Sequence, residues 1–405
     1  MSKINDLIKE LCPNGVEYKN LSYVFDLFSG MTGVSNKWAK EGNCQFIDYM
    51  NAYKNNKIDT SQLPYATVKN LNQTELIKGD LLLTSASEIP DECAIASVIE
   101  DEIKNGIFMD DHLFGLRLKD EYKNKINTTF ISYYLNSKLF RCNLFKAVRG
   151  VTRFYISNKD YMKLTIPVPP IEVQDEIARI LDKFGELEAE LEAELEARKS
   201  QYEFWRGKLL FNSNYPVFKM KDICVINQGL QIPINQRKKE PGKNRYFYIT
   251  VQFLKNEGEN YFIENPSESV ICKKEDILVT RTGSTGKIIY GVEGCFHNNF
   301  FKVTPIIDLN KKYLYHILNS TQMFNEMLRV ASGGTVPDLP HKKFYKLEIG
   351  LPSIKEQERI VAILDKFDKL INDISEGIPA EIELRRKQYE YYRNRLLSFE
   401  EISNE

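Results

Sequence analysis

The segment Gln174-Asp-Glu-Ile-Ala-Arg-Ile-Leu-Asp-Lys-Phe184 returns 183 residues later as Gln357-Glu-Arg-Ile-Val-Ala-Ile-Leu-Asp-Lys-Phe367. A second block, Glu196–Leu210, returns as Glu383–Leu397 after 187 residues, so the second copy carries four extra residues. The first offset also pairs Leu135-Asn-Ser137 with Leu318-Asn-Ser320, Gly150 with Gly333, and Pro169 with Pro352. A repeat of this length decides the architecture before any local motif does. The chain is therefore predicted to be two halves, each a divergent globular part followed by a near-duplicate tail.

The two tails have the apolar spacing of long amphipathic helices. The positions expected on the packed stripe are Ile177, Leu181, Phe184, Leu187, Leu191 and Leu195 in the first tail, and Ile360, Leu364, Phe367 and Leu370 in the second. A helix with one apolar face is not stable alone, so we expect the two tails to pack as an antiparallel coiled coil with an approximate twofold axis. Gly377-Ile-Pro379 and the four extra residues predict a kink or loop in the second tail.

The globular parts mix strand-like and helix-like segments. Asn244–Leu254 is rich in β-branched and aromatic residues, whereas Thr129–Arg141 and Tyr313–Phe324 favour helices. The predicted fold class is α+β, with two globular domains separated by two long helices in a pseudo-twofold internal repeat. The expected boundaries are 1–168 for the first domain, 169–212 for the first helix, 213–351 for the second domain and 352–405 for the second helix and tail.

Composition excludes several classes of protein. The 405 residues carry 55 Lys+Arg and 56 Asp+Glu, a net charge of -1, and 42% of them are apolar, which suits packed cores and not a disordered polyelectrolyte. No long apolar run or signal-peptide core is present, so we expect a cytoplasmic protein without membrane contact. Charge is sorted by segment: Ile171–Lys208 sums to -5, while the two globular parts together hold +7. A nucleic-acid partner is therefore compatible with the neutral total.

The sequence offers no convincing catalytic or metal site. Seven scattered cysteines and four histidines suit neither a disulfide framework nor zinc. Gly283–Lys287 has the look of a phosphate-binding loop but lacks the required first glycine and final Ser or Thr. Pro90-Asp91 with Glu121-Tyr-Lys123 loosely fits a metal-dependent nuclease, and this stays open as a weaker alternative. No methyltransferase signature occurs. We therefore predict that the chain is not an enzyme and binds no cofactor.

Two variable domains, each followed by a helix with Leu-Asp-Lys-Phe and Gln-Tyr-Glu strings (Leu181–Phe184 and Gln201–Glu203, Leu364–Phe367 and Gln388–Glu390), resemble the specificity (S) subunit of type I restriction-modification enzymes. The resemblance covers essentially the whole chain. It implies two target recognition domains that each read one half of a split, asymmetric double-stranded DNA sequence. It also implies helices that recruit two modification subunits, which methylate adenine N6 with S-adenosylmethionine, and restriction subunits that use ATP and Mg²⁺.

Leu187-Glu-Ala-Glu, Leu191-Glu-Ala-Glu and Leu195-Glu-Ala-Arg form a tandem four-residue repeat at a place where this family varies in copy number. Four residues lengthen a helix by about 6 Å and rotate it by about 40°. That length matches one or two base pairs, at about 3.4 Å each. We hypothesise that the repeat sets the gap between the half-sites.

The residues expected to contact DNA are basic or small polar residues in loops. They are Asn36, Lys37, Trp38, Arg149, Thr152 and Arg153 in the first half, and Arg237, Lys238, Arg281, Ser284, Lys287, Gly333, Gly334 and Thr335 in the second. A coiled-coil adaptor with two protein-binding heads is the alternative that needs no DNA contact. Salt-dependent binding to a duplex distinguishes the two.

Overall fold

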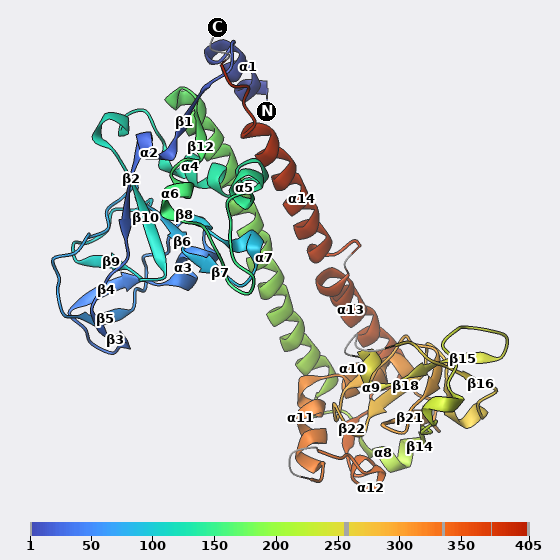
Figure 1. Cartoon of the computed structure of the whole chain (residues 1–405). Helices are drawn as coiled ribbons and strands as arrows, with labels where there is room; N and C mark the ends of the chain where they lie inside the picture. Colours follow the sequence, from blue (N-terminus) through green and yellow to red (C-terminus); the bar gives the residue numbers. More distant parts are fainter. Residues whose placement is uncertain (1, 255–258, 334–336, 374, 403–405) are drawn as a thin grey trace. The chain divides into compact units, whose positions relative to one another are not determined.

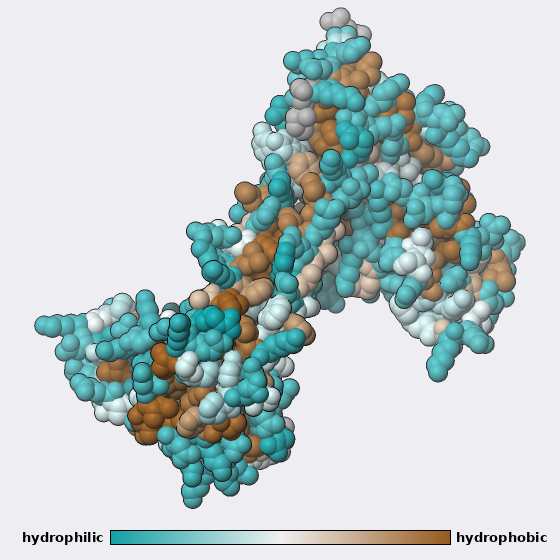
Figure 2. Space-filling model, turned by 180° about the vertical axis from the view of Figure 1, so that it is seen from behind, coloured by the Kyte–Doolittle hydropathy of each residue, from teal (hydrophilic) through white to brown (hydrophobic). Residues whose placement is uncertain are grey.

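The computed structural model describes residues 2–254, 259–333, 337–373 and 375–402. The predicted α+β class is confirmed. The chain forms two compact units: the first combines Met1–Glu190 with Ile382–Glu405, and the second is Leu191–Glu381. Residues 1–168 are called the first head below, and residues 213–351 the second head. Figure 2 shows that polar side chains cover most of the visible surface of each head.

Within the described residues, the first head contains two four-stranded sheets (Figure 1). One is antiparallel with the order β2 (Phe25–Ser29), β10 (Leu113–Leu118), β6 (Leu81–Thr84) and β8 (Ala96–Val98). The other has the order β3 (Val34–Ala39), β5 (Tyr65–Val68), β4 (Cys44–Ile47) and β9 (Ile107–Met109), with β4 and β9 parallel. Two short pairs join β1 (Glu17–Asn20) to β12 (Thr165–Val168) and β7 (Ala86–Ser87) to β11 (Phe154–Tyr155). The helical segments are α1 (Ser2–Leu11), α2 (Leu21–Val24), α3 (Tyr49–Lys54), η1 (Pro90–Glu92), η2 (Asp120–Tyr122), α4 (Thr128–Leu135), α5 (Lys138–Phe145) and α6 (Asn158–Tyr161).

The second head follows the same plan. Its antiparallel sheet has the order β14 (Cys224–Gln228), β21 (Phe300–Pro305), β18 (Ile277–Thr280) and β19 (Ile288–Ile289). Its mixed sheet has the order β16 (Phe262–Glu264), β15 (Arg245–Ile249), β20 (Gly294–Phe296) and β17 (Ile271–Cys272), and β13 (Val217–Lys219) pairs with β22 (Glu348–Gly350). The helical segments are α8 (Met220–Ile223), η3 (Ile234–Gln236), α9 (Val251–Leu254), η4 (Glu268–Val270), α10 (Lys311–Leu318), α11 (Thr321–Val330) and α12 (His341–Phe344).

The tails are the long helices that the repeat predicts. α7 (Ile171–Leu210) is continuous, whereas the second tail is divided into α13 (Ile354–Asn372) and α14 (Ile378–Leu396), which confirms the expected break. Asp373 accepts backbone hydrogen bonds from Ser375 and Glu376 at 2.7 and 3.2 Å and so forms a turn. At Gly377 a Cβ would lie 2.6 Å from the Asp373 carbonyl oxygen, so only glycine fits there.

Within the first unit, α7 and α14 pack antiparallel. The ring of Phe184 lies 5.6 Å from that of Tyr392 and 6.2 Å from that of Tyr389, and further along α7 Glu188 pairs with Arg386. Residue numbers thus rise on one helix as they fall on the other. Within the second unit, the ring of Tyr202 on α7 lies 6.0 Å from that of Phe367 on α13, the reciprocal of the Phe184–Tyr389 contact.

Most of the predicted stripe is covered. Ile177, Leu181, Ile360 and Leu364 are fully buried, and Leu195 and Phe367 pack against the hydrophobic core of the second unit. Phe184 is half-buried and contacts the rings of Tyr389 and Tyr392. Leu191 is half-buried. Leu187 and Leu370 are 37% and 39% exposed. Leu187 lines an open groove on α7, and Leu370 lies two residues before α13 ends.

A buried glutamine at the start of each tail anchors it to its own head. Gln174 Oε1 accepts from the Asn127 backbone N–H at 2.9 Å, and its amide donates to Pro169 O at 2.7 Å. Gln357 makes the equivalent bonds with Asn310 N–H and Pro352 O, at 3.0 and 2.9 Å. The repeat therefore extends to individual hydrogen bonds, and both amides are satisfied where burial would otherwise be costly.

Candidate nucleic-acid interface

In each head, three connecting segments meet at one end of the antiparallel sheet. In the first head they are the turn Asp110–His112 before β10, the loop Ser85–Ile95 after β6 and the segment Arg149–Tyr155. The Ser85 N–H donates to His112 O at 3.0 Å, and the Arg281 N–H donates to Asn299 O at 2.6 Å in the second head. The same frame thus recurs in both heads.

A buried threonine shapes the loop at the end of β6 and of β18. Thr84 Oγ1 accepts from the Ile95 N–H at 2.9 Å and donates to Glu92 O at 3.3 Å. Thr280 Oγ1 accepts from the Lys287 N–H at 2.8 Å and donates to a carbonyl of its own loop. A hydroxyl can donate and accept at once, so the threonine pairs with backbone groups of the loop that have left the sheet.

A glycine lets the end of β2 or β14 approach the turn before the central strand. At Gly30 a Cβ would lie 2.1 Å from Asp110 O, and at Gly229 it would lie 2.2 Å from His297 O. Neither position tolerates a side chain without moving the turn. Leu21–Gly30 resembles Met220–Gly229 in sequence, and the shared final glycine reflects a steric requirement of the same frame.

The third segment is Arg149–Tyr155 in the first head and the stretch that contains Pro337 and Asp338 in the second, and it is tied to the loop by different bonds in the two heads. In the first head β11 pairs with β7, which matches Phe154 with Ser87. In the second head Arg281 forms a two-pronged ion pair with Asp338, at 2.7 and 3.1 Å, and Thr285 donates to Pro337 O. The hydrogen bond to Asp338 raises the pKa of Arg281.

The predicted residues on β3 lie beside this cluster in the first head. The Lys37 ammonium lies 3.1 Å from Asp110 Oδ2 and also pairs with Asp111. Partial burial opposes ionisation of Asp111, yet the hydrogen bond from Lys37 holds its pKa at about 2. Asp110, Asp111 and His112 are spaced for a metal ion, but the two carboxylates pair with the Lys37 ammonium, and the His112 ring lies 2.9 Å from Asp110 Oδ1.

Trp38 is exposed where β3 is irregular. Its φ is +60°, the register shifts between Lys37 and Ala39, and 63% of the residue is accessible. Its ring makes an edge contact with Phe46 at 5.6 Å. A bulky residue in the left-handed region stores strain that often marks a functional site. Asn36 is also exposed on β3.

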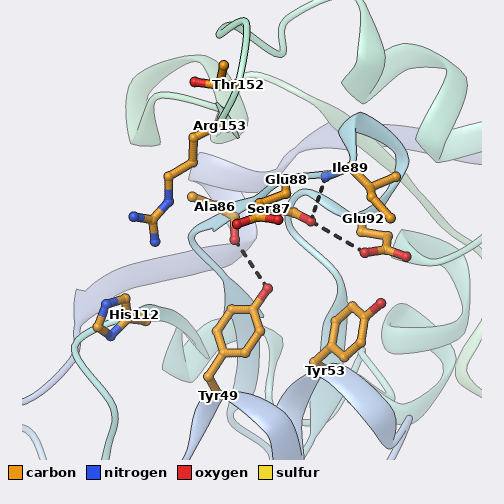
Figure 3. A pocket seen from close by; sticks show the side chains of 10 residues that line it. All are labelled: Tyr49, Tyr53, Ala86, Ser87, Glu88, Ile89, Glu92, His112, Thr152 and Arg153. Atoms are coloured by element: carbon orange, nitrogen blue, oxygen red, sulfur yellow. Dashed lines mark hydrogen bonds between the residues drawn. The ribbon is translucent and has the colours of Figure 1, made fainter. Parts of the chain in front are cut away.

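Thr152 and Arg153 line a cleft of about 790 Å³ in the first head (Figure 3). The other lining residues are Tyr49, Tyr53, Ala86, Ser87, Glu88, Ile89, Glu92 and His112. Arg149 is exposed beside it on the same segment and pairs with Asp160 at 3.3 Å. The cleft therefore combines carboxylates, a guanidinium and aromatic rings, which suits contact with base edges.

The second head places its predicted residues less uniformly. The Arg237 guanidinium stacks 5.0 Å from the ring of Tyr248 and 5.5 Å from that of Tyr261, and it donates to Ile232 O. Arg281 and Ser284 belong to the loop after β18, and Lys238 is exposed with its backbone paired to Phe262.

Two further positions complete the predicted set in the second head. Lys287 lines a separate hollow of about 370 Å³ beside Leu318 and Phe324. Gly333 is exposed with φ +109°, while Gly334 and Thr335 lie outside the described residues.

The weaker catalytic readings find no support. Asp91 lies in the loop beside the start of β10, whereas Glu121 follows its end, and six strand residues span about 20 Å. The two carboxylates therefore cannot share a metal ion as the nuclease alternative requires. Gly283–Lys287 leads into the strand β19 and not into the helix that a phosphate-binding loop needs.

Sequence reasoning missed the aromatic and acidic walls of the cleft. Tyr49 and Tyr53 lie on α3, and Glu88 and Glu92 lie in the loop after β6. These residues have no counterpart in the matching segment of the repeat, so offset matching could not find them. The three carboxylates of Ser85–Ile95, without any basic residue, were the available signal.

The duplicated frame with unlike loops defines a class: a protein with two recognition heads and no catalytic centre within its described residues. The family model for the type I restriction modification DNA specificity domain matches residues 13–197 and 212–384. The chain is 36% identical over 305 residues to the EcoR124I/EcoR124II specificity subunit of Escherichia coli, which covers 69% of this chain and 74% of that protein. The chain therefore belongs to the family of type I restriction-modification specificity subunits, which are noncatalytic, recognise DNA and assemble with other subunits.

Solved structures support the fold. A chain from a structure titled for complex assembly and conformational transition of the type I R-M system matches with a TM-score of 0.69 at 13% identity, covering 95% of this chain and 98% of that one. The HsdS subunit from Thermoanaerobacter tengcongensis matches with a TM-score of 0.53 at 15% identity, covering 96% of each chain. Among the described residues, no helix has the length and apolarity to cross a bilayer.

Proposed function

We propose that this chain reads a bipartite, asymmetric DNA sequence, one half-site with each head, and positions two modification subunits on it. The observation that carries the proposal is the repeated frame with different side chains in its loops. A frame that occurs twice in the chain suits two copies of one partner, and different loop side chains in the two heads suit two different half-sites.

The partner subunits supply the chemistry in this proposal. Modification subunits use S-adenosylmethionine to methylate adenine N6, and restriction subunits use ATP and Mg²⁺ to move and cut DNA. We propose that the chain itself holds none of these groups and that it acts in the cytoplasm, where the host DNA is its target. The division into 1–168, 169–212, 213–351 and 352–405 is proposed as the functional division, because each head is followed by the helix that a buried glutamine, Gln174 or Gln357, ties to it.

The proposal is tested by purifying the chain with its host's modification subunits and mapping methylated adenines on genomic DNA. We expect one split motif with a fixed gap, and duplex binding that weakens steeply with salt. Absence of a split motif, with the complex intact, would contradict the reading role and favour the protein-binding adaptor.

The Leu-Glu-Ala-Glu repeat within α7 supports a second part of the proposal, that helix length sets the gap. Removing Leu191–Glu194 shortens the helix by about 6 Å and rotates it by about 40°. We expect both half-sites to be kept and the gap to change by one or two base pairs. A control that replaces Glu192 and Glu194 by glutamine keeps the length and should keep the gap. An unchanged gap after the deletion refutes this part.

A further inference from the structure

The loop that follows β6 in the first head and the loop that follows β18 in the second carry opposite charges. Ser85–Ile95 contains three carboxylates and no basic residue, whereas Arg281–Lys287 contains two basic residues and no carboxylate. Each loop begins after a threonine at the end of the equivalent strand, Thr84 on β6 and Thr280 on β18, and this threonine accepts a hydrogen bond from a backbone N–H at the end of the loop. The frame is therefore constant while the chemistry that it presents is reversed.

Within the first-head cleft the two glutamates are not equivalent. Glu92 is half-buried and accepts from the Ser87 hydroxyl at 3.4 Å, and its hydrogen bond with Tyr53 raises the pKa of that phenol. Glu88 is exposed, lines the cleft, and has no hydrogen bond or ion pair within the described ranges. Glu92 therefore stabilises the wall, and Glu88 is free to accept from a ligand (Figure 3).

Arg153 faces the same cleft from the neighbouring segment. It is exposed, lines the cleft, and forms no ion pair with any residue that the structure describes. Ser87 pairs with Phe154, so the backbone pairing of β7 and β11 holds the two segments together. One cleft thus presents a free carboxylate and a free guanidinium from the residues that directly follow β7 and precede β11.

This pair of groups matches the major-groove edge of one base pair. A carboxylate only accepts hydrogen bonds, so it fits the N4 amino group of cytosine and is repelled by the acceptors of guanine and thymine and by N7 of adenine. A guanidinium donates in a fork that fits O6 and N7 of guanine. These are the two edges of a single C·G pair.

We propose that Glu88 and Arg153 together read one C·G base pair in the half-site of the first head, Glu88 on cytosine and Arg153 on guanine. The inference rests on the proposed function and adds the base pair to it. The carboxylate weakens nonspecific attachment to phosphates, so it contributes by rejecting the three wrong bases at its position.

The test uses the whole complex with modification subunits and maps methylated adenines for the wild type, Glu88→Gln and Arg153→Ala. Both variants should relax the same base pair, lowering discrimination at that position by about 5- to 150-fold, and leave the other half-site unchanged. Glu121→Gln and Lys104→Ala, which alter exposed charges of the first head outside the cleft, should keep the motif. An unchanged half-site for the second head and an unchanged unfolding midpoint would show that the variants are folded.

The possible outcomes distinguish a failure of the C·G assignment from a failure of the proposed function. Relaxation at two different base pairs, an unchanged motif, or a first-head half-site without a C·G pair overturns the inference while the proposed function stands. If a variant loses all methylation, competition between oligonucleotides that replace each base pair in turn gives the same decision from binding alone. A wild-type complex without any split motif refutes the proposed function itself.

Discussion

A close backbone approach at Gly30 in the first head and at Gly229 in the second predicts how a single alanine would disturb one head and the half-site that it reads. At Gly229 a new Cβ would lie 2.2 Å from His297 O, whereas ordinary contact begins at 3.4 Å, so the turn must move by roughly 1.2 Å. Forced displacement of this kind costs about 1–3 kcal/mol. Because the second unit is about 190 residues long, its unfolding midpoint should fall by about 2–12 °C.

The same displacement should act on recognition. The turn that contains His297 and Asn299 holds the loop of Arg281 through the Arg281 N–H bond to Asn299 O. Gly229→Ala should therefore blur the half-site read by the second head and leave the other half-site intact. Gly30→Ala should do the reverse, because its Cβ would lie 2.1 Å from Asp110 O.

Calorimetry and methylation mapping of the whole complex measure both effects. Gly207→Ala is the matched control: it lies in α7 with no atom within 4 Å of its Cβ position, so alanine there should stabilise the helix by about 1 kcal/mol. Equal loss of both half-sites for Gly229→Ala, or an unchanged midpoint and motif, would refute the reasoning.

Two further predictions concern the second head. Arg281→Ala should relax one position of the half-site that this head reads, by about 1–3 kcal/mol of discrimination, and methylation mapping would show uniform weakening instead if Arg281 contacts only phosphates. Burial lowers the pKa of His316 below its ordinary 6.5, so the unfolded state takes up the proton first and stability should fall as pH drops below about 6.5. His316→Tyr, which installs the residue found at Tyr133, should reduce the loss of midpoint between pH 7.5 and 5.5, and unchanged pH dependence would contradict this.

The helices and their register were accessible to sequence reasoning because the tails repeat almost residue by residue. Phe184 and Phe367 are in the predicted stripes, and each contacts the tyrosine of the other repeat, Tyr389 or Tyr202. The break near Gly377 was also predictable, since glycine, proline and extra residues coincide there.

The loops at the end of each antiparallel sheet were only partly predictable. Charge alone predicts that basic residues in these loops contact DNA, but Lys37 and Arg281 form ion pairs with Asp110 and Asp338. Such pairs join residues 73 and 57 positions apart in sequence, and nothing local in the chain signals them. The cleft-lining Glu88 was overlooked for the opposite reason, because an acidic residue is not expected near DNA until its neighbours are known.

The division between constant and variable parts follows from what each bond has to do. Gln174 and Gln357, Thr84 and Thr280, and Gly30 and Gly229 all satisfy backbone groups or clear space for backbone, so their role is independent of the ligand. The charged side chains of Glu88 and Arg153 satisfy no backbone group within the described residues, so their charge can change without altering the frame. Substitutions in the frame should therefore damage stability and recognition together, while substitutions of Glu88 and Arg153 should change only the sequence that is read.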